Sequence, residues 1–204
     1  MPMPTPTRND LVITTLGPRQ VRSPMAFEPN VKFVDDATRV RFQQEIGPGE
    51  ENLGDLGFEK AGPREHLFFD PAQVTAAVVT CGGLCPGLNN VIRSVTLELH
   101  FNYGVRSVLG IREGYRGLNP DLGIEPKVLT PEDLSEIQNL GGTILASSRG
   151  PQPAEKMVDF LINQEIDMLF CVGGDGTMRG AHAIVEEVGR RGLHRLEQVV
   201  DQRL

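Results

Sequence analysis

Residues 169–177 read LFCVGGDGT and join a short apolar run to a glycine-rich turn. The run, from Asp167 to Val172, is bounded by turn signals, which is typical of a buried parallel strand. A helical pattern follows the turn at once, with apolar residues at the 3.6-residue period: Met178, Ala181, Ile184, Val185 and Val188. Such a junction gathers backbone N–H groups at the positive end of a helix dipole, so we expect it to bind phosphate.

Asp175 lies within this turn and is a candidate metal ligand. Because no basic residue follows it before Arg179, its carboxylate is free to hold a phosphate-bound Mg²⁺ through oxygen. The alternative is an ordinary turn between a strand and a helix, with glycines for tightness and Asp175 or Thr177 as the helix cap. The string GGDGT alone does not separate the two interpretations, because short motifs also occur by chance.

The composition is that of a soluble globular protein with an acidic balance. Of the 204 residues, 39% are hydrophobic and 23% are charged, and the formal net charge is −7. That charge argues against a nucleic-acid partner, whose binding surface would be basic. No apolar run reaches the length of a membrane span, and the start of the chain shows no signal peptide. The odd number of cysteines (Cys81, Cys85 and Cys171) favours reduced thiols, so we expect a cytoplasmic protein without a membrane partner.

The distribution of prolines and glycines divides the chain into three regions. Residues 1–72 show weak periodicity and many of these breakers, which predicts an N-terminal extension that wraps over a core, with short strands at 31–34 and 67–69. Residues 73–193 carry the regular hydrophobic patterns of a folded domain. Residues 194–204 form a divergent C-terminal tail.

Strand and helix patterns alternate within residues 73–193. Apolar runs predict strands at 76–80, 105–111, 143–145 and 167–172. Helices are predicted from Leu88 to a C′ residue at Gly104, from a cap at Thr130 to a stop at Gly141, and over 153–163. This alternation implies right-handed βαβ units, and hence an α/β fold with a doubly wound, mostly parallel sheet and helices on both faces.

Two glycine turns, Gly82-Gly83 and Gly173-Gly174, therefore follow the carboxyl ends of two strands, where ligands bind in such sheets. A third loop ends in Arg149, whose guanidinium can fork onto phosphate oxygens. Two backbone turns, an arginine and a metal-binding carboxylate are the parts that a phosphoryl-transfer site needs. Neither turn has the Gly-Lys-Ser/Thr of a P-loop, and the dinucleotide-binding fingerprint is absent.

Five motifs occur in the order and spacing of the phosphofructokinase family: TCGGLCPGLN at 80–89, GYRG at 114–117, GGT at 141–143, SSR at 147–149 and GGDGT at 173–177. The resemblance covers about residues 62–193, and the extension resembles that of the long-chain branch, which includes plant-type and related bacterial enzymes. It implies the N-terminal nucleotide-binding half of that fold. It also implies the glycolytic transfer of the γ-phosphoryl of ATP to the 1-hydroxyl of fructose 6-phosphate, and a homo-oligomer for a full-length member.

The resemblance also implies roles for individual residues. Gly82 and Arg149 would contact the nucleotide phosphates, Tyr115 would lie near the adenine, and Asp175 would hold Mg²⁺. The phosphate path would be lined by Gly174, Gly176 and Thr177. A glycine after the aspartate leaves room for the α-phosphate of ATP, whereas an aspartate there accompanies pyrophosphate, so Gly176 favours ATP as the donor over pyrophosphate.

Several of these residues also have a simpler interpretation. Tyr115 is suited to pack on the sheet edge, and Arg149 to be a solvated loop charge. Arg93, on the first helix of the domain, is interpreted as a surface or interface residue, because the partner arginine of the family's effector site is replaced by Leu97. His182 is interpreted as a packed or exposed histidine rather than a base.

The sequence departs from the family after Leu193. The family's Thr-Ile-Asp-Asn-Asp loop, which supplies the aspartate that accepts the sugar hydroxyl proton, is absent, and residues 194–204 read HRLEQVVDQRL. We therefore expect a C-terminal truncation, and the sequence identifies no catalytic general base. Two other functions stay open: a kinase of the NAD or lipid type, which shares GGDGT but lacks the first glycine turn, and a non-catalytic nucleotide-binding fragment.

Overall fold

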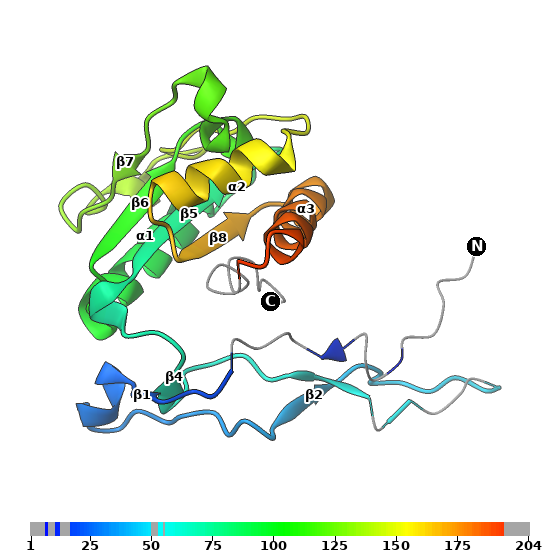
Figure 1. Cartoon of the computed structure of the whole chain (residues 1–204). Helices are drawn as coiled ribbons and strands as arrows, with labels where there is room; N and C mark the ends of the chain where they lie inside the picture. The colour runs from blue at the N-terminus through cyan, green and yellow to red at the C-terminus, as the bar shows by residue number, and fades with distance from the viewer. Residues whose placement is uncertain (1–6, 8–10, 13–16, 50–52, 55, 194–204) are drawn as a thin grey trace.

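A computed structural model describes residues 7, 11–12, 17–49, 53–54 and 56–193, so the predicted tail at 194–204 lies outside the described residues. The core of the protein is a sheet in the strand order β7-β6-β5-β8 (Figure 1). Strands β5 (Thr75–Thr80), β6 (Ser107–Ile111) and β8 (Met168–Val172) are parallel, and the short edge strand β7 (Lys127–Val128) is antiparallel to β6. The predicted mostly parallel α/β sheet is confirmed.

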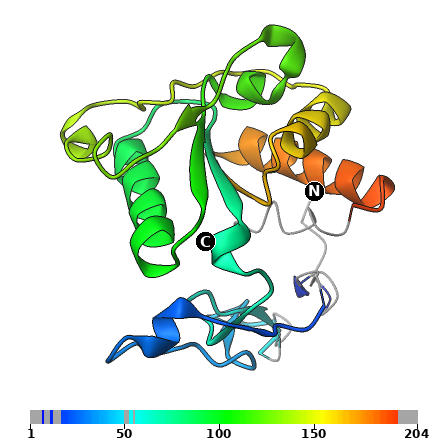
Figure 2. The same ribbon diagram turned by 60° about the vertical axis from the view of Figure 1, so that its left-hand side comes forward.

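Helices cover both faces of the sheet, as predicted. Helix α1 (Leu88–Leu97), which continues as a π-helical turn over Glu98–Asn102, lies on one face. Helices α2 (Ala154–Asn163) and α3 (Asp175–Arg190) lie on the other face (Figure 2). Every residue of β5 is buried, because alternate side chains enter two separate apolar clusters, one beneath α1 and one beneath α2 and α3.

The predicted helix that begins at Thr130 is wrong. The expected cap does form, since the Asp133 N–H donates to Thr130 Oγ1 over 3.3 Å. However, only turns and the 3₁₀ helix η7 (Ile137–Asn139) follow. The reason lies in α1, whose side chains take the backbone groups that a helix would use: Arg93 Nε donates to the Leu134 carbonyl, and Asn89 Nδ2 donates to the Leu140 carbonyl.

Two predicted strands are wrong as well. Residues 31–34 have no regular structure. Residues 143–145 form a turn, because the Ile144 N–H donates to Asn89 Oδ1 and the Leu145 N–H to Thr143 Oγ1 rather than to a neighbouring strand. The glycine predicted to close the first helix does adopt left-handed backbone, with φ of +64° at Gly104.

The N-terminal region lies beneath the amino-terminal end of the sheet in both views, rather than over one of its faces (Figures 1 and 2). Its two small antiparallel sheets pair β1 (Val21–Arg22) with β4 (His66–Leu67), and β2 (Arg39–Arg41) with β3 (Gly57–Glu59). Short 3₁₀ turns complete the described elements: η2 (Pro24–Phe27), η3 (Pro71–Gln73), η5 (Gly114–Leu118) and η6 (Pro120–Leu122).

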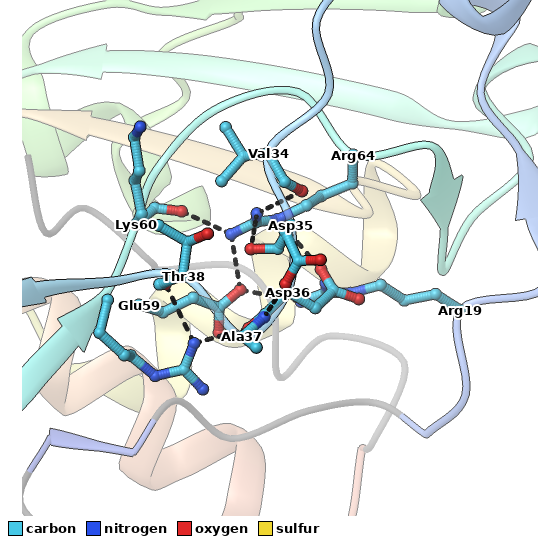
Figure 3. Close-up of polar contacts among 10 residues, drawn as sticks. Arg19, Val34, Asp35, Asp36, Ala37, Thr38, Glu59, Lys60 and Arg64 are labelled. Carbon is cyan, nitrogen blue, oxygen red and sulfur yellow. Dashed lines mark hydrogen bonds and ion pairs between the residues drawn. The ribbon is translucent and has the colours of Figure 1, made fainter.

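An ion network holds this region together (Figure 3). Glu59 Oε1 accepts hydrogen bonds from Arg19 and Arg64, at 3.1 and 3.0 Å, and both arginines also pair with Asp36. The Arg64 guanidinium donates as well to the carbonyl of Val34, over 2.9 Å. The network ties segments that are far apart in the sequence, in a region that contributes few residues to the apolar clusters of the core.

Candidate functional site

Two glycine turns lie side by side at the carboxyl edge of the sheet. We call residues 81–87, after β5, the first elbow, and residues 173–176, which run from the end of β8 into the first turn of α3, the second elbow. Parallel pairing places Thr80 opposite Val172, and the Cys81 N–H donates to the Val172 carbonyl over 2.9 Å. The sheet therefore brings the two predicted turns together.

Close packing explains the first glycine of the second elbow. A Cβ added to Gly173 would lie 2.1 Å from Thr177 Oγ1 and 2.8 Å from the Cys81 carbonyl oxygen, so no larger residue fits. Thr177 is buried directly beneath, at 3% exposure. Gly174 and Gly176 are exposed. A Cβ added to Gly174 would meet nothing within 4 Å, and one added to Gly176 would meet only the Arg179 guanidinium, at 4.0 Å. The second elbow is therefore tight on its protein side and open on its solvent side.

The start of α3 presents backbone donors and a carboxylate to solvent. The Thr177 and Met178 N–H groups donate to the Gly174 carbonyl, at 2.8 and 3.1 Å. Within the described chain, the N–H groups of the exposed residues Asp175 and Gly176 have no hydrogen-bond partner. The helix cap is Gly174 and makes no side-chain cap bond, so the prediction that Asp175 or Thr177 caps the helix is wrong, whereas the close packing at Gly173 agrees with glycines that serve for tightness.

The Asp175 carboxylate suits a magnesium ion that arrives with a phosphate ligand. Mg²⁺ in proteins is commonly held by one or two carboxylates together with substrate phosphates and water. Asp175 is exposed at the helix start and so can supply one such oxygen. Among the described residues, no group of three or more His, Cys, Asp or Glu side chains could hold a metal on its own. The donor set therefore fits a metal shared with a bound nucleotide.

The first elbow is held open by left-handed glycines. Gly82 and Gly87 have φ of +81° and +95°, and a Cβ added to either would meet nothing within 4 Å. The Gly82 N–H is engaged, since it donates to the Ser148 carbonyl over 3.1 Å. The N–H of the exposed Gly83 has no partner within the described part of the chain. The sequence predicts the Gly82-Gly83 turn as a ligand site but assigns the phosphate contact to Gly82, whereas in the structure the Gly83 amide is free to donate to a ligand.

Arg149 lies over the first elbow. A Cβ added to Gly83 would be 3.7 Å from one terminal nitrogen of Arg149. The side chain is exposed and makes no ion pair or hydrogen bond with any residue that the structure describes. An unpaired guanidinium beside free backbone donors makes this edge of the sheet suitable for an anion.

Tyr115 has a packing role beneath the second elbow. Its ring is 6% exposed and fills the space left by Gly180, where an added Cβ would lie 2.3 Å from Tyr115 Cε2. Its hydroxyl donates to the Thr177 carbonyl over 2.7 Å. Burial raises the pKa of this hydroxyl, so it stays protonated. These contacts agree with the interpretation of Tyr115 as a packing residue. Its position near the adenine stays a prediction.

The buried thiols beside the elbows are not nucleophiles. Burial raises the pKa of Cys81 to about 12 and that of Cys171 to about 11, so both remain thiols at neutral pH. His182 is exposed and lies 3.5 Å from Glu186 on the outer face of α3. Arg93, half-buried, is bonded to the Leu134 carbonyl. Neither side chain contributes to the elbows.

No described helix is both long and apolar enough to cross a membrane.

The phosphofructokinase family model matches residues 75–200, from the start of β5 to a point beyond Leu193. The chain is 53% identical, over 70% of its length, to the ATP-dependent 6-phosphofructokinase of Entamoeba histolytica, and 43% identical, over 91% of its length, to that of Amycolatopsis methanolica. It spans 32% and 42% of those two proteins.

Solved structures show the same fold. The phosphofructokinase of Pichia pastoris in the T-state matches with a TM-score of 0.53 at 25% identity, over 70% of this chain and 16% of that one. A pyrophosphate-dependent phosphofructokinase from Marinobacter aquaeolei matches with a TM-score of 0.52 at 18% identity, over 58% of this chain and 31% of that one, and this likeness concerns the fold alone.

Proposed function

The chain belongs to the phosphofructokinase family, and from this premise we propose that it forms the nucleotide-binding part of an ATP-dependent 6-phosphofructokinase. The reaction transfers the γ-phosphoryl of ATP to the 1-hydroxyl of fructose 6-phosphate, giving ADP, fructose 1,6-bisphosphate and a proton, a step of glycolysis. The relatives named ATP-dependent 6-phosphofructokinase support this reaction. The chain spans less than half of each of them, so the activity of the whole enzyme is proposed, not established, for this chain.

One observation carries the proposal: the two elbows lie side by side, with Arg149 over one and Asp175 at the edge of the other. The elbows and Arg149 would bind the polyphosphate through N–H groups and the guanidinium, with Gly82, Gly174, Gly176 and Thr177 along its path. Asp175 would hold Mg²⁺, which neutralises the charge of the phosphates when bound. Tyr115 would lie near the adenine.

ATP is the proposed donor rather than pyrophosphate. The open space in front of Gly176 supports this choice, because a nucleoside triphosphate needs room for its α-phosphate beside the helix start. A side chain at this position would enter that room. Two further features of the proposal concern the whole protein: it would be cytoplasmic, which the three free cysteines support, and a full-length member would be a homo-oligomer. The division into an extension (1–72), a nucleotide-binding domain (73–193) and a tail (194–204) is also proposed.

A second candidate is a nucleotide-binding fragment without turnover, since the chain spans only 32% and 42% of the two relatives named above. Binding and turnover should therefore be measured separately. Titration calorimetry with MgATP, with and without EDTA, tests the site, and a coupled assay for fructose 1,6-bisphosphate tests the reaction. Binding with turnover supports the enzyme, and binding without turnover supports the fragment. If MgATP does not bind, both are wrong. If MgATP binds, an assay of phosphoryl transfer from ATP to NAD in place of fructose 6-phosphate tests the alternative kinase.

A further inference from the structure

The loop that carries Arg149 contains a residue in an unusual backbone conformation. Ala146 has φ of +57°, in the left-handed region that residues with a Cβ rarely adopt. The Ala146 side chain is exposed, so packing around its methyl group does not hold this conformation. Non-glycine residues keep such geometry when surrounding contacts impose it, and these residues gather at functional sites. The contacts around Ala146 therefore show what fixes the loop.

A chain of hydroxyl groups fixes Ala146 to the end of β5. Thr80, the last residue of that strand, is fully buried, and its hydroxyl donates to the Ala146 carbonyl over 2.8 Å. Thr80 Oγ1 also lies 2.9 Å from Thr143 Oγ1. Because each hydroxyl has a single hydrogen, Thr143 must be the donor to Thr80 in this pair. Thr143 Oγ1 in turn accepts from the Leu145 N–H over 3.2 Å. The left-handed turn is thus bonded on both sides of Ala146.

The residues after Ala146 then run along the first elbow. Ser147 Oγ donates to the Gly82 carbonyl over 2.6 Å, and the Gly82 N–H donates to the Ser148 carbonyl. Ser148 Oγ donates to the Glu113 carbonyl over 2.6 Å, which ties the loop to the turn after β6. Arg149 follows directly. Its position over Gly83 therefore depends on the direction that the chain takes at Ala146.

We propose that Thr80 is a positioning residue of the nucleotide site: its buried hydroxyl sets the left-handed turn at Ala146 and so aims Arg149 at the first elbow. This proposal rests on the proposed function, because the position of Arg149 affects binding only if the site binds a nucleotide. Thr80 contacts no ligand in this proposal. Its effect passes through the Ala146 carbonyl and the loop that follows.

The test compares two substitutions in the full chain. Thr80→Val replaces the hydroxyl by a methyl group of similar size, and valine is common in strands. Thr80→Ser keeps the hydroxyl. Hydrogen exchange of the peptide that covers residues 145–150 reports the loop without any ligand. We expect Thr80→Val to speed that exchange several-fold and to raise the Kd for MgATP about fivefold to tenfold, which is the effect of one or two lost hydrogen bonds. Thr80→Ser should restore both values while the melting temperatures of the two variants stay close.

Unchanged loop exchange in a folded Thr80→Val variant would overturn the proposal, and so would equal losses of MgATP affinity in the Val and Ser variants. If Thr80→Val does not fold, Thr80→Ala, which also removes the donor to the Ala146 carbonyl, takes its place and must give faster loop exchange than Thr80→Ser. Failure of the proposed function is a separate result: the unsubstituted chain would then not bind MgATP, while the exchange experiment still decides whether Thr80 holds the loop.

Discussion

The backbone N–H of Cys81 donates a 2.9 Å hydrogen bond to the carbonyl of Val172, and this bond joins the ends of β5 and β8. Beyond it the chains turn away through Gly82-Gly83 and Gly173-Gly174, so two sets of exposed backbone donors lie at one edge of the sheet. The gap between the elbows is narrow, because the Cys81 carbonyl and the Thr177 side chain both approach Gly173. A larger residue at Gly173 should therefore disturb both elbows.

Replacement of Gly173 by alanine should destabilise the protein and disrupt the site together. Its Cβ would lie 2.1 Å from Thr177 Oγ1 and 2.8 Å from the Cys81 carbonyl, so the start of α3 must move. We expect a loss of about 1–3 kcal/mol in the free energy of unfolding, measured by denaturant titration. Gly189→Ala, within α3, is the control, because an added Cβ there meets nothing within 4 Å. Equal stability in the two variants would contradict the packing described here.

Loss of the Arg149 guanidinium should weaken nucleotide binding without loss of stability. The side chain is exposed and unpaired among the described residues, so Arg149→Ala removes no contact of the fold. A charge-assisted bond to phosphate contributes about 1.5–3 kcal/mol, so the Kd for MgATP should rise roughly tenfold to a hundredfold in calorimetry. Arg41→Ala, an exposed arginine on β2, provides the control for loss of one positive charge. A solvated loop charge would give the same Kd in both variants.

An aspartate in place of Gly176 should disfavour ATP. The position is exposed and an added Cβ would meet only the Arg179 guanidinium at 4.0 Å, so the fold should tolerate the change. The new carboxylate would occupy the room proposed for the α-phosphate and repel it, and we expect at least a tenfold rise in the Kd for MgATP. Gly176→Ala, which adds volume without charge, separates the two effects. If Gly176→Asp binds MgATP as tightly as the unsubstituted chain, Gly176 does not select the donor.

How far the sequence predicts this structure depends on where each segment finds its hydrogen-bond partners. Strand β5 and helix α3 follow from local patterns, because their apolar residues recur at the periods of a strand and a helix and their backbone bonds are regular. The segment from Thr130 to Leu145 has the same apolar signals, and Leu134 and Ile137 are buried as expected. Its secondary structure was predicted wrongly because Asn89 and Arg93 bind its backbone groups.

In the candidate site, too, local patterns predict the positions of the turns, whereas distant residues decide which backbone groups are free. Glycines after buried strands predicted both elbows, since parallel strands bring their carboxyl ends to one edge. No pattern in the sequence predicts that the Gly82 N–H is engaged by Ser148 and the Gly83 N–H is free, because that depends on a loop more than sixty residues away. The partner of Thr80 is equally distant, although a threonine at the end of a buried strand is a polar group that needs one.

The pair of helices beside the site should lose stability in acid through Glu187. This carboxylate lies on α3 and accepts hydrogen bonds from Arg190 and Arg191, which lower its pKa from the ordinary 4.5 to about 2. Arg191 also donates to Asp159 of α2 over 2.6 Å, so the cluster joins the two helices. A depressed pKa means that the stabilisation is complete above pH 4.5 and is lost as the pH falls toward 2.

Glu187→Gln should therefore lower the melting temperature at neutral pH and flatten the dependence of the melting temperature on pH between 4.5 and 2. Glu186→Gln, on the exposed face of the same helix, is the control. Parallel acid profiles for the two variants would show that Glu187 is not the group that titrates.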